Sequence, residues 1–274
     1  MIENTEIPAE PRAVPRRFRN HRLRRGIYLL PSFFTVANLL CGYYAVLATF
    51  HGGAAGMDNA AKAIGLAILF DALDGRIARA TGTNSEFGRE FDSLADVVSF
   101  GIAPACLAFA WGVRGDLQTD LTIVHHIYQL GWVISFTFVI CCAWRLARFN
   151  VHGMAGGMRY FVGLPTPPAA GMIAAIVHAM RNPISDWRLS LLWLVLVLGL
   201  GFLMTSTIRY YGFKDVQWQK RQRSLILILI GILLGAVVFY SQPTLLLIAS
   251  AYVLSGLTLQ IARSLRRRPP SHPA

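Results

Sequence analysis

Long apolar segments alternate with short polar stretches along most of this chain. Each of eight apolar segments is near the roughly 20 residues that a helix needs to cross a bilayer, and the fifth is short. Their approximate limits are residues 32–50, 59–81, 86–111, 122–144, 164–180, 188–208, 224–240 and 243–262. The pattern predicts an all-α, polytopic integral membrane protein with about eight transmembrane helices.

Polar and basic residues flank the apolar region at both ends. Residues 1–15 are polar and contain prolines, which predicts a disordered tail. Residues 16–30 combine a cluster of arginines with apolar side chains, so we expect a basic interfacial segment on an anionic membrane surface. A simple topological signal would have the same composition. Residues 31–264 are then expected to form one membrane domain, and residues 265–274 a basic C-terminal tail.

The composition excludes an ordinary soluble domain. The 274 residues are 54% hydrophobic and 15% charged, and the mean hydropathy is +0.47. The net charge of +12 comes from basic residues between apolar segments, which indicates topology and anionic lipid partners rather than nucleic acid. With the N-terminus in the cytoplasm, all but four of the 26 lysines and arginines lie on the inner side. We therefore expect a multi-pass protein of the cell inner membrane with both termini cytoplasmic.

Four aspartates interrupt the apolar pattern. Charge within such segments is costly without a compensating function. Asp71 and Asp74 are spaced i, i+3 on one expected helix, and Asp92 and Asp96 are spaced i, i+4 on the next, so each pair lies on one helical face. If the two helices pack antiparallel, the four carboxylates converge near the cytoplasmic face. Such a cluster repels itself unless protons, cationic side chains or metal ions balance it.

The residue types around the cluster favour metal-assisted chemistry at phosphorus. Donors that are all oxygen suit Mg²⁺ or Mn²⁺ better than zinc, and two ions are expected. Gly75 and Ala78 leave the helix bare beside the carboxylates, and Arg79 supplies a fixed charge suited to phosphate. Two metal ions could hold a diphosphate there and stabilise a departing phosphate.

Two other uses of the acidic residues stay open at this point. The aspartates could form ion pairs with Arg76, Arg79 and Arg89 in a purely structural role, as in a non-catalytic membrane scaffold. A cation or proton transporter also places acids in membrane spans. Against transport, the acids crowd one membrane boundary and no other span carries a mid-membrane acid to continue a path.

The spacing D-x2-D-G-x2-A-R-x8-G-x3-D-x3-D resembles the complete signature of the CDP-alcohol phosphatidyltransferase family. Its fixed positions here are Asp71, Asp74, Gly75, Ala78, Arg79, Gly88, Asp92 and Asp96. The resemblance implies an integral membrane enzyme, usually a homodimer, that moves a phosphatidyl group from a CDP-linked lipid to an alcohol and releases CMP.

The resemblance also implies roles for the signature residues. Asp71, Asp74 and Asp92 would bind the metal ions, and Asp96 would contribute to metal binding and deprotonate the acceptor hydroxyl. The CDP-lipid would contact Gly75, Ala78, Arg79 and Gly88. Direct displacement at phosphorus is the preferred route, and a two-step route through a phosphatidyl-enzyme stays open.

Further stretches resemble one branch of that family, the membrane-integral bacterial phosphatidylserine synthases. They are LPSFFTVANLLCGYYA, EFDSLADVVSFGIAPA, RLARFN and FVGLPTPPAAG. This resemblance implies CDP-diacylglycerol as donor and L-serine as acceptor. Sibling enzymes that use glycerol phosphate, choline or an inositol compound share the signature and stay as alternatives.

Four more polar residues are candidates for substrate binding. Arg145 and Arg148, at i, i+3, could hold the serine carboxylate or a lipid phosphate, and Asn150 could accept from the serine ammonium. The positive-inside rule alone would also explain these arginines. Asn38 is a lone amide in an apolar span, where a CDP-lipid contact and a helix-to-helix hydrogen bond are equally good interpretations.

Overall fold

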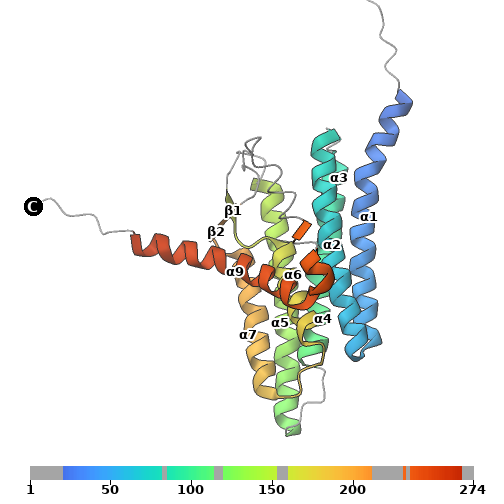
Figure 1. The fold of residues 1–274 in the computed structure, drawn as a ribbon. Helices are drawn as coiled ribbons and strands as arrows, with labels where there is room; N and C mark the ends of the chain where they lie inside the picture. The colour runs from blue at the N-terminus through green and yellow to red at the C-terminus, as the bar shows by residue number, and fades with distance from the viewer. Residues whose placement is uncertain are drawn as a thin grey trace, which may run out of the picture.

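A computed structural model describes residues 21–81, 85–113, 120–152, 160–211, 231–232 and 235–266. The described chain is almost entirely helical (Figure 1). In order, its elements are α1 (His21–His51), α2 (Gly53–Thr81), α3 (Glu86–Asp96), η1 (Val97–Ile102), α4 (Ala103–Gly112), α5 (Leu121–His152), β1 (Tyr160–Val162), α6 (Thr166–Met180), α7 (Trp187–Thr205), β2 (Arg209–Tyr211) and α9 (Ser241–Arg266). This order confirms the predicted helical class.

Four helical segments in the described part are long and apolar enough to cross a membrane, namely Phe33–His51, Glu86–Gly112, Leu121–Val151 and Trp187–Thr205. The helix α6 is apolar but shorter. The helix α2 is not among the four, and its charged residues, the aspartates among them, lower its hydropathy. These helices make the chain a multi-pass membrane protein. The predicted count of about eight spans stays a prediction, because most of segment 224–240 lies outside the described residues.

A tight turn connects the first two helices. Gly52 and Gly53 have φ angles of +75° and +69°, a backbone conformation that favours glycine. The turn reverses the chain, so that α1 and α2 lie against each other. The helix α1 begins at His21, so residues 21–30 of the predicted interfacial segment are helical and continuous with the first apolar segment. Residues 1–20 lie outside the described part.

The third apolar segment contains a local change of helix type. Ser85 caps α3 by accepting a hydrogen bond from the backbone N–H of Gly88. The π-helix η1 follows directly after Asp96 and leads into α4 without a break. Single π-helical turns inside α-helices occur frequently at functional sites.

Small buried residues let the helices approach closely around this segment. The helix α1 packs against α2, α3, η1 and α4, and α5 packs against η1, α4 and α7. Many of the fully buried residues between them are alanines, which is typical of helix contacts in membranes. Large apolar side chains lie on the outside instead, including Phe33, Leu40, Trp132, Leu192 and Phe202. This distribution suits a protein surrounded by lipid.

Two features differ from the pattern predicted from hydropathy. The strands β1 and β2 form a short antiparallel pair, with Phe161 opposite Tyr210. The helix α9 covers the eighth apolar segment, yet Figure 1 shows it running across the direction of α1, α5 and α7. Hydropathy measures how apolar a segment is and carries no information on the direction in which it packs.

Candidate active site

Three of the four aspartates lie together, one from α2 and two from α3. One carboxylate oxygen each of Asp71, Asp92 and Asp96 lies within 4.8 Å of the other two. Asp96 is buried, and the other two are half-buried. At an effective dielectric constant of about 20, two negative charges at this distance repel by on the order of 3 kcal/mol. The cluster therefore requires protons or cations to be stable.

Asp74 lies beside the cluster in a different environment. It is 5% exposed and accepts a short hydrogen bond from the hydroxyl of Thr35 on α1. The group of mutually close oxygens does not include Asp74. The convergence expected of all four carboxylates is thus seen for three of them, and the fourth is hydrogen-bonded to a hydroxyl of α1.

One face of α1 lies against the acidic residues. Thr35, Asn38 and Gly42 follow the spacing i, i+3 and i+7, which places them on this face. The fully buried Asn38 donates from Nδ2 to Oδ1 of Asp96 at 3.1 Å. Its backbone carbonyl accepts a hydrogen bond from Ser99 Oγ at 2.9 Å. Asn38 is therefore hydrogen-bonded to the carboxylate to which the family resemblance assigns the role of general base.

The contact between α1 and η1 leaves no room for a larger residue. A Cβ atom on Gly42 would lie 2.4 Å from Ser99 Oγ, which is closer than side chains approach. The sequence did not indicate that Thr35 and Ser99 belong to the site. The helical spacing of Thr35 from Asn38 was a signal that could have indicated the first of them.

Three buried polar atoms near the acidic residues have no hydrogen-bond partner among the described residues. They are Oδ1 of Asn38, Oδ1 of Asp92 and Nε of Arg145. Leaving a buried polar atom unpaired costs about 1–3 kcal/mol, so such atoms require an explanation. A bound cation for the carboxylate and a polar substrate for the other two would supply the missing partners. The donor set of oxygens fits Mg²⁺ or Mn²⁺.

The two predicted acceptor arginines have different surroundings. Arg145 is 7% exposed, donates from Nη1 to Thr166 Oγ1 at 3.3 Å, and attracts the charge of Asp96. Arg148 donates to the backbone carbonyls of Thr205, Val162 and Ser206 at 3.0, 2.9 and 3.4 Å. Arg145 therefore faces the acidic cluster, whereas Arg148 holds β1 and the end of α7.

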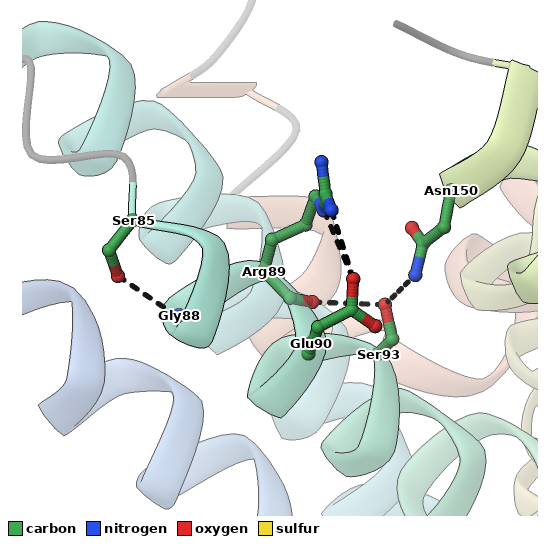
Figure 2. Close-up of polar contacts among 6 residues, drawn as sticks. All are labelled: Ser85, Gly88, Arg89, Glu90, Ser93 and Asn150. Atoms are coloured by element: carbon green, nitrogen blue, oxygen red, sulfur yellow. Dashed lines mark hydrogen bonds and ion pairs between the residues drawn. The ribbon is translucent and has the colours of Figure 1, made fainter.

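Asn150 connects the end of α5 to α3 (Figure 2). Its Nδ2 donates to Ser93 Oγ at 2.9 Å, and Ser93 donates to the carbonyl of Arg89 at 3.0 Å. Arg89 forms an ion pair with Glu90, with Nη2 3.0 Å from Oε1. Because Ser93 follows Asp92 directly, these bonds fix the position of α5 relative to the acidic residues.

The remaining signature residues lie on the same two helices. Gly75 and Ala78 are half-buried on α2 after Asp74. Gly88 is half-buried in the first turn of α3, where its N–H is the one capped by Ser85. The side chain of Arg79 lies outside the described residues.

Comparison with known proteins agrees with this arrangement. The family model for CDP-alcohol phosphatidyltransferase matches residues 28–202. A CDP-diacylglycerol–serine O-phosphatidyltransferase of Helicobacter pylori is 33% identical over 75% of this chain and 81% of its own length. The enzyme of that name from Bacillus subtilis is 30% identical over 68% of this chain and 91% of its length. An archaetidylserine synthase of Methanothermobacter thermautotrophicus is 33% identical over 66% of this chain and 69% of its own length.

The matched range contains all four aspartates and every helix that contributes to the cluster. This family generally depends on divalent metal, in agreement with the oxygen-only donor set. The chain belongs to the CDP-alcohol phosphatidyltransferase family.

Proposed function

We propose that this protein transfers the phosphatidyl group of CDP-diacylglycerol to the hydroxyl of L-serine and releases CMP. One observation supports the choice of acceptor most strongly. Serine occurs in the names of relatives from two bacteria and an archaeon, including the one whose name specifies an archaetidyl lipid. The acceptor is thus shared across relatives whose lipid differs.

The carboxylates supply the proposed metal site. Asp71, Asp92 and Asp96 would hold one Mg²⁺ or Mn²⁺ ion, and Asp74 would contribute to a second. When bound, the ions neutralise the diphosphate of the CDP-lipid and stabilise the phosphate that leaves with CMP. The orphaned Oδ1 of Asp92 supports this assignment, because a buried carboxylate oxygen needs a cationic or hydrogen-bonding partner.

Asp96 is the proposed general base. Asn38 holds its Oδ1, which orients the carboxylate and leaves the second oxygen to accept the proton of the serine hydroxyl. The deprotonated hydroxyl oxygen then attacks the phosphorus that carries diacylglycerol, and the bond to CMP breaks. We propose a single direct displacement. Inversion of configuration at phosphorus supports that route, and net retention excludes it.

Arg145 is the proposed anchor for the serine carboxylate. Its buried guanidinium interacts electrostatically with Asp96, and its Nε has no hydrogen-bond partner among the described residues. A carboxylate can receive two parallel hydrogen bonds from a guanidinium. Arg148 and Asn150 would support the site by holding β1, α7 and α3 in place. Gly75, Ala78, Arg79 and Gly88 would face the CDP-lipid.

Topology and assembly complete the proposal. About eight spans would place both termini and the acidic cluster at the cytoplasmic face of the inner membrane. The basic N-terminal segment would contact anionic lipid, and the enzyme would act as a homodimer.

Release of CMP by the purified protein tests the proposed function. The protein is incubated in detergent with CDP-diacylglycerol, a divalent metal and, one at a time, serine, glycerol 3-phosphate, choline and inositol. We expect release that depends on serine. Release with another acceptor would assign the chain to a sibling activity, and no release with any of the four would contradict the proposal.

A further inference from the structure

A second polar network lies at the other end of α2, about 20 Å from Asp71 along the helix. It joins Asp58 of α2, His178 in the last turn of α6 and Ser241, the first residue of α9. Nδ1 of His178 lies 2.5 Å from Oδ1 of Asp58, and Nε2 lies 2.9 Å from Ser241 Oγ. The imidazole thus connects a carboxylate to a hydroxyl.

Lys62 fixes the acid of this network. Its Nζ lies 2.8 Å from Oδ2 of Asp58, the oxygen that His178 does not contact. Asp58 precedes the predicted span 59–81. Burial opposes its ionisation, but hydrogen bonds from Lys62 and His178, together with the charge of Lys62, outweigh that effect and lower the pKa of Asp58. In the neutral imidazole whose Nδ1–H donates to the ionised Asp58, Nε2 accepts a hydrogen bond from the hydroxyl of Ser241.

The order acid, imidazole, hydroxyl is the arrangement that activates a serine nucleophile. A base within hydrogen-bond reach of the hydroxyl, itself oriented by a third group, is the diagnostic geometry. His178 is 4% exposed, whereas Ser241 is half-buried, so a substrate can reach the hydroxyl more easily than the imidazole. Ser241 also begins a helix of 26 residues, whose N-terminus stabilises negative charge on a nearby oxygen.

We propose that Asp58, His178 and Ser241 form a second catalytic site that cleaves carboxylic esters of membrane lipids. The location selects this substrate class. All three residues lie at or near the ends of predicted spans, at the boundary opposite to the acidic cluster, and lipid ester groups lie at such boundaries. The proposal does not depend on the transferase activity.

The reaction balances with water as the second reactant. Ser241 Oγ adds to the ester carbonyl while its proton moves to His178 Nε2. The ester C–O bond then breaks, and the alcohol leaves with that proton. Water hydrolyses the acyl-serine in the second half, with His178 accepting a proton from water and returning it to Ser241.

Labelling with a fluorophosphonate probe tests the site on the full-length protein in detergent. Peptide mass spectrometry of the wild-type protein should find the adduct on Ser241. The S241A variant should lose it, and H178Q and D58N should reduce its rate of formation at least tenfold. The matched control is S255A on the same helix, because the hydroxyl of Ser255 donates to the backbone carbonyl of Tyr252 rather than to a histidine.

A single cooperative thermal unfolding transition reports the folded state of each preparation, so the test does not rest on the transferase activity. A folded wild-type preparation without an adduct on Ser241 would overturn the proposal, whatever the variants do. An adduct that forms at the same rate in folded H178Q and D58N would also overturn it, because Ser241 would then react without activation.

Discussion

The two ends of α2 differ in how their buried charges are balanced. Around Asp58, the polar groups have partners within the protein. Lys62 and His178 bind the carboxylate, and Ser241 forms a hydrogen bond with the second ring nitrogen of His178. Around Asp92, three carboxylates lie within 4.8 Å, and buried atoms of Asn38, Asp92 and Arg145 lack partners among the described residues. At the first end, other residues of the protein supply the hydrogen-bond and charge partners of the buried groups. At the second end, a bound cation and a polar substrate would have to supply them. The predictions that follow test this difference.

Removal of divalent metal should have the largest effect. EDTA should reduce CMP release to background, and added Mg²⁺ or Mn²⁺ should restore it, because the carboxylates repel one another without a cation. Labelling of Ser241 should be unchanged by the same treatment. Full CMP release in EDTA would contradict a metal-dependent site at Asp71, Asp92 and Asp96.

Replacement of the proposed base should have the next largest effect. We expect Asp96→Asn to lower CMP release by on the order of 10²–10⁴-fold, since a positioned base contributes that much. Asparagine keeps a side-chain oxygen that can bind a cation, so metal and nucleotide should still bind. The control is Glu90→Gln, an exposed acid of the same helix, which should stay near the wild-type rate. Retention of most activity in Asp96→Asn would refute the assignment of the base.

Asn38→Ala distinguishes positioning of Asp96 from binding of the CDP-lipid. If Asn38 orients the carboxylate, kcat should fall about 10–100-fold while KM for CDP-diacylglycerol stays close to the wild-type value. Steady-state kinetics over both substrates measures this. A raised KM with unchanged kcat would instead assign Asn38 to the nucleotide.

Gly42→Ala tests the close contact between α1 and η1. The added methyl would lie 2.4 Å from Ser99 Oγ, so we expect overpacking that lowers the free energy of unfolding by about 1–3 kcal/mol. Thermal unfolding measures the loss. The matched control is Gly199→Ala in α7, where a Cβ would meet nothing within 4 Å. Equal stability of the two variants would refute the tight contact.

His178→Gln should have the smallest effect on the transferase. Loss of a buried hydrogen-bonded imidazole should lower the free energy of unfolding by about 1–3 kcal/mol. CMP release by the folded protein should stay within about threefold of the wild-type rate, because the network lies about 20 Å from Asp71. A loss as large as that of Asp96→Asn would show that the two ends of α2 are not independent.

The acidic residues were predictable because helical geometry alone places them. Spacing along a helix determines which residues share a face, independently of how the helices pack. Asp92 and Asp96 therefore share one face of α3, and Asp71 of α2 lies with them in the cluster. Asp74 shows the limit of this argument, since its partner Thr35 lies 39 positions away on α1. Spacing within a helix does not predict which residue of another helix will contact it.

The contacts between distant helices were not predictable for the same reason. Ser99 reaches Asn38 across 61 positions, and His178 meets Asp58 across 120. The partners of His178 come from α2 and α9, and no spacing within α6 indicates them. Hydropathy likewise identified the segment of α9 but not its direction across the bundle.

Product analysis tests the central claim most directly. The purified protein is incubated with CDP-diacylglycerol, Mn²⁺ and ¹⁵N-labelled serine, and both products are quantified by mass spectrometry. We predict labelled phosphatidylserine in equal amount to CMP, with both lost in Asp96→Asn. Two results would contradict a serine-dependent transfer at the acidic cluster. One is CMP formed at the same rate in the absence of serine, and the other is CMP formed with no labelled phosphatidylserine.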